Sequence, residues 1–197
     1  MRFSGTERNV DEAPNPALHR MRLCRIGELD VDRRRYYVRR LTRAKWMLAI
    51  VAAGLFLSGV TVWPAVSELR AGVSWIWGDE VATGELHGFI LRAIAGLEET
   101  KMRYPFMLYA HDWLAFAHIM LAILFAGAIR DPVRNKWIVQ CGLIMCALVP
   151  VLAGICNPIR ELPGWWFWID FSFAPGAALP LWIAYRDIKY MEQQSKT

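Results

Sequence analysis

Four stretches of this chain are long enough and apolar enough to cross a lipid bilayer, and they limit the possible folds more than any other feature. Residues 46–67 and 137–159 contain 22 and 23 residues without a charge, and residues 104–129 and 166–185 are also predominantly apolar. A helix of about 20 residues spans a hydrocarbon core of about 30 Å. The pattern predicts an all-α, polytopic membrane protein with four transmembrane helices in an antiparallel bundle.

The distribution of basic residues predicts the orientation of these helices. Eighteen of the 23 Lys and Arg residues lie in three parts of the chain that a four-span topology places on one side, and twelve of them precede residue 46. Because basic residues flanking membrane spans stay in the cytoplasm, both termini should be cytoplasmic. A basic run directly before an apolar segment also fits anionic lipid headgroups, so we expect the lipid bilayer as a partner and no nucleic acid.

The chain should therefore divide into three parts. Residues 1–45 form a basic cytoplasmic extension, polar and without clear periodicity up to about residue 30, followed by a juxtamembrane helix over 31–45. Residues 46–190 form the transmembrane domain, and residues 191–197 form a cytoplasmic tail. Within that domain the predicted spans are about 46–66, 105–129, 137–156 and 166–185.

Two further features concern helix packing. Between residues 84 and 103 apolar residues recur with helical period, which predicts an amphipathic helix on the outer surface, with His87 exposed to solvent. In the first span Gly54 and Ser58 form a pair of small residues that would permit close helix contact; alternatively, both face lipid.

Ionisable residues within the apolar segments mark the candidate site. His111, Asp112 and His118 lie on the 104–129 segment, and the topology places Asp170, Asn157 and Arg160 in the same outer half of the membrane. Such residues are costly in lipid and usually face a bundle interior or a watery cavity. They indicate either an outward-opening polar site for a small ligand or for proton relay, or an internal lock. In the lock, Asp112 or Asp170 pairs with Arg160, and His118 binds a neighbouring carbonyl.

Cofactor and catalytic patterns are sparse. A haem with two histidine ligands needs them on different helices, whereas His111 and His118 share one helix. The second ligand would have to be Met47, Met120 or Met145, or His118 of a second copy, so haem is not expected. Seven residues of spacing also separate them by about 10 Å along the helix axis, too far to chelate one metal ion. No Cys-x-x-Cys, phosphate-binding loop or recognisable catalytic set is present, so no cofactor and no metal are predicted, and no residue is assigned a catalytic role.

Several motifs in residues 101–188 resemble a family of bacterial integral membrane proteins that has no established activity. They are MRYPF at 102–106, HDWLAFAH at 111–118, IRDPVRNKW at 129–137, NPIRELPGWW at 157–166 and IDFSF at 169–173. The resemblance covers nearly half of the chain and extends more loosely to the first span. It implies four helices and a bacterial cytoplasmic (inner) membrane location, but no reaction.

Three function classes follow from these observations. The first is a structural or accessory subunit of a membrane complex, with other membrane subunits or further copies of the chain as partners; the absence of a complete catalytic set favours this class over an enzyme without excluding one. The second is binding of a lipid, quinone or other small amphiphile at the outer polar residues. The third is a transporter or proton-coupled channel, which would require four-span chains to form a homo-oligomer around a path.

Overall fold

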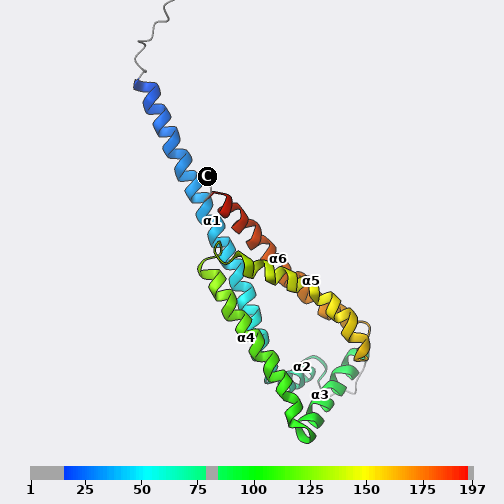
Figure 1. The fold of residues 1–197 in the computed structure, drawn as a ribbon. Coiled ribbons are helices and arrows are strands. Elements are labelled where there is room, and N and C mark those ends of the chain that lie inside the picture. The colour runs from blue at the N-terminus through cyan, green and yellow to red at the C-terminus, as the bar shows by residue number, and fades with distance from the viewer. Residues whose placement is uncertain (1–15, 79–83, 195–197) are drawn as a thin grey trace, which may run out of the picture. The chain divides into compact units, whose positions relative to one another are not determined.

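The computed structural model describes residues 16–78 and 84–194, with side chains from Val31 onwards, and these ranges are entirely helical apart from their turns (Figure 1). Within them the prediction of an all-α chain is confirmed, and no strand occurs. The elements are α1 (Pro16–Val62), α2 (Ala65–Trp77), α3 (Glu85–Arg103), the short 3₁₀ turn η1 (Pro105–Leu108), α4 (Tyr109–Arg130), α5 (Lys136–Ile159) and α6 (Trp166–Gln194).

Four of these helices are long and apolar enough to cross a membrane, as the sequence predicts. The candidate spans are Val31–Val62, Pro105–Arg130, Lys136–Ile159 and Trp166–Gln194. Pro150 lies inside α5, and Pro175 and Pro180 lie inside α6, without ending either helix. A membrane helix tolerates an interior proline where neighbouring groups satisfy the backbone carbonyl that the proline leaves unpaired.

The chain divides into two compact units, residues 1–40 and residues 41–197. In the first unit, residues 16–40 are helical, including the part up to about residue 30 in which the sequence shows no clear periodicity; residues 1–15 lie outside the described ranges. Pro16 suits a helix start, and the Ala, Leu, Arg and Met residues after it have high helix propensity. Further along, the Arg40 guanidinium bonds to the Tyr36 hydroxyl and lies over its ring, 4.6 Å from the centroid.

In the second unit α5 and α6 pack along their lengths and run in opposite directions. Lys136 at the start of α5 pairs with Glu192 at the end of α6, while Asn157 near the end of α5 contacts Asp170 near the start of α6. Helices α1 and α4 join them in one buried apolar cluster. Its members are Ala44, Leu48 and Val51 of α1, Phe125 and Ala128 of α4, Val139 of α5, and Leu181, Ala184, Ile188 and Met191 of α6.

The close contact of α1 with α4 is made by Gly59. A Cβ atom at Gly59 would lie 2.8 Å from the Ala115 carbonyl oxygen and 2.9 Å from Ile119 Cγ1, so only a hydrogen fits there. The same construction at Gly54 meets nothing within 4 Å. The prediction of close helix contact through Gly54 and Ser58 is therefore wrong at Gly54, which instead fits the lipid-facing alternative.

Two helices, rather than one, follow α1 before η1. The amphipathic helix predicted between residues 84 and 103 is α3, while α2 was not predicted. Arg70 of α2 donates to Glu98 of α3 with an Nε–Oε1 distance of 2.9 Å, and joins the two helices. Phe89 of α3 contacts the rings of Trp165 and Trp166, at centroid distances of 5.6 and 5.1 Å, and so connects α3 to the turn between α5 and α6.

His87 is buried, which contradicts the expectation that its side chain is exposed to solvent. Its side chain lies on α3 with only 2% of its surface exposed, and its ring stacks on Trp77 of α2 at a centroid distance of 4.7 Å and an angle of 11°. The cause is α2, which covers the face of α3 that carries His87. Among the described residues, the buried Nδ1 atom of His87 has no hydrogen-bond partner.

Candidate functional site

The three candidate residues of α4 lie near its first turns and have different surroundings. His111 and Asp112 are exposed, and Asp112 Oδ1 accepts a hydrogen bond from the indole Nε1 of Trp63 at 3.1 Å. Trp63 directly follows α1, so this bond joins the ends of two neighbouring helices. His118, two turns further along, is half-buried, and its Nδ1 lies 2.8 Å from the carbonyl oxygen of Leu114. That nitrogen therefore carries the ring hydrogen and donates to its own helix.

The candidate residues of α5 and α6 form a second pair. Asn157 is 9% exposed, and its Nδ2 donates to Asp170 Oδ2 at 3.0 Å. The backbone carbonyl of Asn157 also accepts from the amide of Leu162 at 3.0 Å, which closes the α5–α6 turn. Glu161 in that turn adopts a left-handed conformation with φ of 54°. The amide and the carboxylate thus hold α5 and α6 together next to the turn that joins them.

Three of the candidate residues therefore form hydrogen bonds to other side chains, and their partners differ from those of the predicted lock. Asp112 bonds to Trp63 and Asp170 to Asn157, whereas Arg160 is exposed and makes no ion pair within the described part of the chain. The bond of His118 to a neighbouring carbonyl is the one that the lock predicts. Across residues 31–78 and 84–194, no three His, Cys, Asp or Glu side chains are arranged to hold a metal ion.

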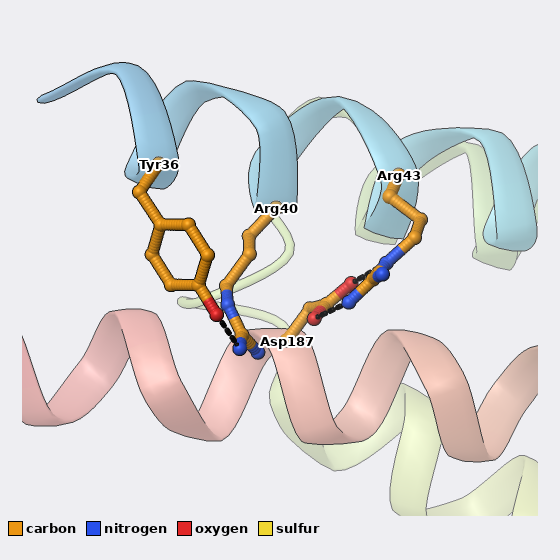
Figure 2. Close-up of polar contacts among 4 residues, drawn as sticks. All are labelled: Tyr36, Arg40, Arg43 and Asp187. Atoms are coloured by element: carbon orange, nitrogen blue, oxygen red, sulfur yellow. Dashed lines mark hydrogen bonds and ion pairs between the residues drawn. The ribbon is translucent and has the colours of Figure 1, made fainter. Parts of the chain in front are cut away.

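The most deeply buried polar contact is one that the sequence analysis did not predict. Arg43 of α1 donates from Nε to Asp187 Oδ2 at 2.7 Å and from Nη2 to Oδ1 at 2.6 Å, across to α6 (Figure 2). Asp187 has no exposed side-chain surface, whereas the Arg43 side chain is 55% exposed. Two parallel charge-assisted bonds of this kind fix both direction and distance between their partners.

A signal for this contact exists in the sequence. Leu181, Ala184, Ile188 and Met191 recur at helical spacing, so the apolar face of α6 continues past the predicted end of the span. Asp187 lies on that face, adjacent to Ile188 and three residues after Ala184. A carboxylate on a buried face requires a cation, and Arg43 occupies the corresponding position beside Ala44 on α1.

A second ion pair lies at the same end of α6. Lys136 Nζ is 2.6 Å from Glu192 Oε2, with both side chains about 30% exposed. Together with Arg43 and Asp187, this pair connects the C-terminal part of α6 to both α1 and α5. Both ends of α6 are thus held by polar contacts, through Asp170 at its start and through Asp187 and Glu192 at its end.

The hydrogen bonds and ion pairs of these side chains favour a role in positioning helices over a catalytic role. Each carboxylate described above bonds to a group on another helix or at its end, and His118 bonds to its own helix. Of the six candidate residues, His111 and Arg160 have no such contact within the described ranges and remain available for a ligand. Comparison of the chain with protein-family models, with curated proteins and with solved structures finds no match, so the family resemblance noted above stays a prediction.

Proposed function

We propose that this protein is an integral, multi-pass protein of a bacterial cytoplasmic membrane. The support is the surface of its four long helices, where large apolar side chains point outward. Leu57 of α1, Ile123 of α4, Leu152 of α5 and Leu179 of α6 are each 60–65% exposed, and at most 22% of the apolar 18-residue segment of any candidate span is buried within the chain. Apolar surface of this extent is unfavourable in water and is matched by lipid tails.

Within that membrane the four helices form an antiparallel bundle with both termini in the cytoplasm. The concentration of Lys and Arg in residues 1–45, 130–136 and 186–197 supports this orientation. A cytoplasm-active reporter fused after Thr197 or inserted at Asn135 should be active, and a periplasm-active reporter at either position should be silent. The matched control is a fusion at Gly164, where the two reporters should exchange. Periplasmic activity after Thr197 would contradict this topology.

Its role in that membrane is structural or accessory, as a subunit of a larger membrane assembly. The single observation that favours this role is the use of the polar side chains: Asp112, Asp170 and Asp187 each bond to another helix or its end. Polar contacts of this type hold membrane helices in register. A rigid bundle with much exposed apolar surface suits a subunit that other membrane helices contact.

The test compares variants of paired and unpaired candidate residues. Under the accessory role, His111→Gln and Arg160→Gln leave both abundance and association with other membrane polypeptides unchanged in mild detergent. Asn157→Leu lowers abundance and association together, because it opens the hairpin. Loss of cellular function in His111→Gln or Arg160→Gln, with normal abundance and association, would contradict the accessory role.

That contradicting result would favour the second candidate, binding of a small amphiphile at the outer polar end. The specific observation in its favour is that the side chains of His111 and Arg160 are exposed and make no hydrogen bond or ion pair to the rest of the described chain. An imidazole and a guanidinium there offer donors to a quinone oxygen or a lipid headgroup. This function predicts that a lipid or quinone copurifies with the wild type and is lost from His111→Gln.

A further inference from the structure

An apolar groove lies between the end of α1, α2 and the start of α3. Its volume is about 500 Å³, within the usual range for small-molecule sites. Its walls are formed mainly by Ala, Val, Leu, Ile and Trp side chains. The lining includes Thr61, Glu68, Gly72, Ile76, Trp77 and Leu86. The Thr61 hydroxyl already donates to the carbonyl of Ser58, which leaves Glu68 as the main polar group. Such a lining fits a ligand without polar groups along its length.

The groove is held open by contacts behind its walls. Trp77 is fixed by its stack on the buried ring of His87, and α2 is tied to α3 by Arg70 and Glu98. On the inner wall Gly72 leaves space, because a Cβ atom built there meets nothing within 4 Å. The cavity is therefore a feature of the fold and does not depend on a mobile side chain.

The groove is continuous with the apolar exterior at the end of a candidate membrane span. Ile76 and Leu86 line it and are themselves 58% and 43% exposed. Nearby, Trp63 and Trp75 are 56% and 87% exposed, and exposed tryptophans of this kind concentrate at the boundary between lipid tails and headgroups. An acyl chain entering the groove from this boundary meets mainly apolar side chains, with Glu68 and Thr61 as the exceptions in the lining.

We propose that this groove holds an acyl chain of a phospholipid from the outer leaflet. The inference rests on the proposed membrane location and goes beyond the proposed accessory role. Its single carboxylate, Glu68, lies on an exposed position at the groove, so the site selects for the tail and disfavours an anionic headgroup directly beside it. The bound lipid would hold α2 and α3 against the membrane surface.

The test uses the full chain in vesicles of phosphatidylethanolamine and phosphatidylglycerol, with a photoactivatable diazirine in the acyl chain of a trace phosphatidylethanolamine. Labelled peptides are mapped by mass spectrometry. We expect adducts on residues 61–90, and Gly72→Phe, which fills the groove, should lower them several-fold. The matched control is Gly96→Phe on α3, where an added Cβ also meets nothing within 4 Å but does not line the groove. That variant should keep the wild-type pattern.

The outcomes separate this proposal from the membrane location. Labelling of α4 and α5 without labelling of α2 and α3, or labelling of α2 and α3 that Gly72→Phe leaves unchanged, overturns the groove proposal and leaves the membrane location intact. Absence of labelling on every helix overturns both. An interchain disulfide through Ile76→Cys, with α2 protected from the lipid probe, shows that a second copy covers the groove and also overturns the proposal.

Discussion

Arg43 of α1 donates hydrogen bonds to both carboxylate oxygens of Asp187 of α6, from Nε at 2.7 Å and from Nη2 at 2.6 Å. Of the two side chains, only that of the arginine reaches solvent. The pair is asymmetric: the Asp187 side chain is fully buried and the Arg43 side chain is 55% exposed. Burying a carboxylate is costly unless it is paired. Arg43 therefore allows an acidic residue to occupy the apolar interface of α1 and α6, which includes Ala44, Leu48, Ala184 and Ile188.

Because of this asymmetry, replacing Arg43 and replacing Asp187 should lower the free energy of unfolding by different amounts. Arg43→Met removes the bidentate partner of a buried charge, and should destabilise the protein by about 3 kcal/mol. Asp187→Asn leaves a half-exposed arginine that water solvates, and should cost less. The measurement is thermal unfolding of both variants in the same detergent. The double variant Arg43→Met/Asp187→Leu should recover most of the loss, because an apolar pair can replace a buried ion pair. Equal destabilisation by both single variants would contradict this account.

Replacing Gly59 with alanine, the smallest possible increase in side-chain size, should lower the stability of the protein. In Gly59→Ala the new methyl group meets the backbone oxygen of Ala115, which cannot rotate away, so α1 and α4 must separate. Overpacking of this kind costs about 1–3 kcal/mol. The control is Gly54→Ala on the same helix, where the methyl group meets no atom within 4 Å and stability should not fall. Melting temperatures of the two variants check the prediction, and a Gly54→Ala variant as unstable as Gly59→Ala would refute it.

The pair Asn157 and Asp170 should contribute to stability through the hydrogen bond between α5 and α6. Asn157→Leu leaves the Asp170 carboxylate without its amide donor, and should cost about 1–3 kcal/mol. Asp170→Asn retains a carbonyl acceptor and should cost less. Arg160→Gln provides the control from the same turn, since its exposed side chain should contribute less than about 0.5 kcal/mol. Unfolding in detergent measures all three; unchanged stability of Asn157→Leu would show that the bond has no structural role.

His87 should be replaceable by phenylalanine. The histidine contributes a ring that stacks on Trp77, while its buried Nδ1 has no partner among the described residues, which is unfavourable. His87→Phe keeps the ring and removes the polar atom, so stability should be equal or higher. His87→Ala leaves a cavity and should cost about 2 kcal/mol or more. If His87→Phe is as harmful as His87→Ala in thermal unfolding, the imidazole nitrogens have a role that the packing does not explain.

The number and positions of the long helices follow from the sequence because hydropathy depends on composition over about 20 residues, which no tertiary contact alters. The helix α2 was not predicted because it has only 13 residues and its apolar positions are interrupted, Leu69 by the charged residues on either side and Val73 by Gly72 and Ser74. That omission caused the error at His87. Position 87 lies on the same face of α3 as Ile90 and Ile94, but its burial depends on α2, which covers that face.

The candidate site was predicted less well, for a physical reason. Residues such as Asp112 and Asn157 can be placed at one end of the membrane from hydropathy and charge, but hydrogen-bond partners depend on the rotation of each helix about its axis. The hydrogen bond from Trp63 to Asp112, for example, depends on how the end of α1 and the start of α4 are rotated toward each other. Asp187 lies two residues after the last predicted span, 166–185, although the apolar periodicity of α6 continues around it.

Native mass spectrometry of the tagged protein, extracted from its own membranes in mild detergent, tests the accessory role most directly. The account predicts a complex whose mass includes at least one other polypeptide, and that polypeptide should remain bound to the His111→Gln and Arg160→Gln variants. A monomer or homo-oligomer as the sole species, under conditions in which a known membrane complex from the same extract stays intact, would contradict the account.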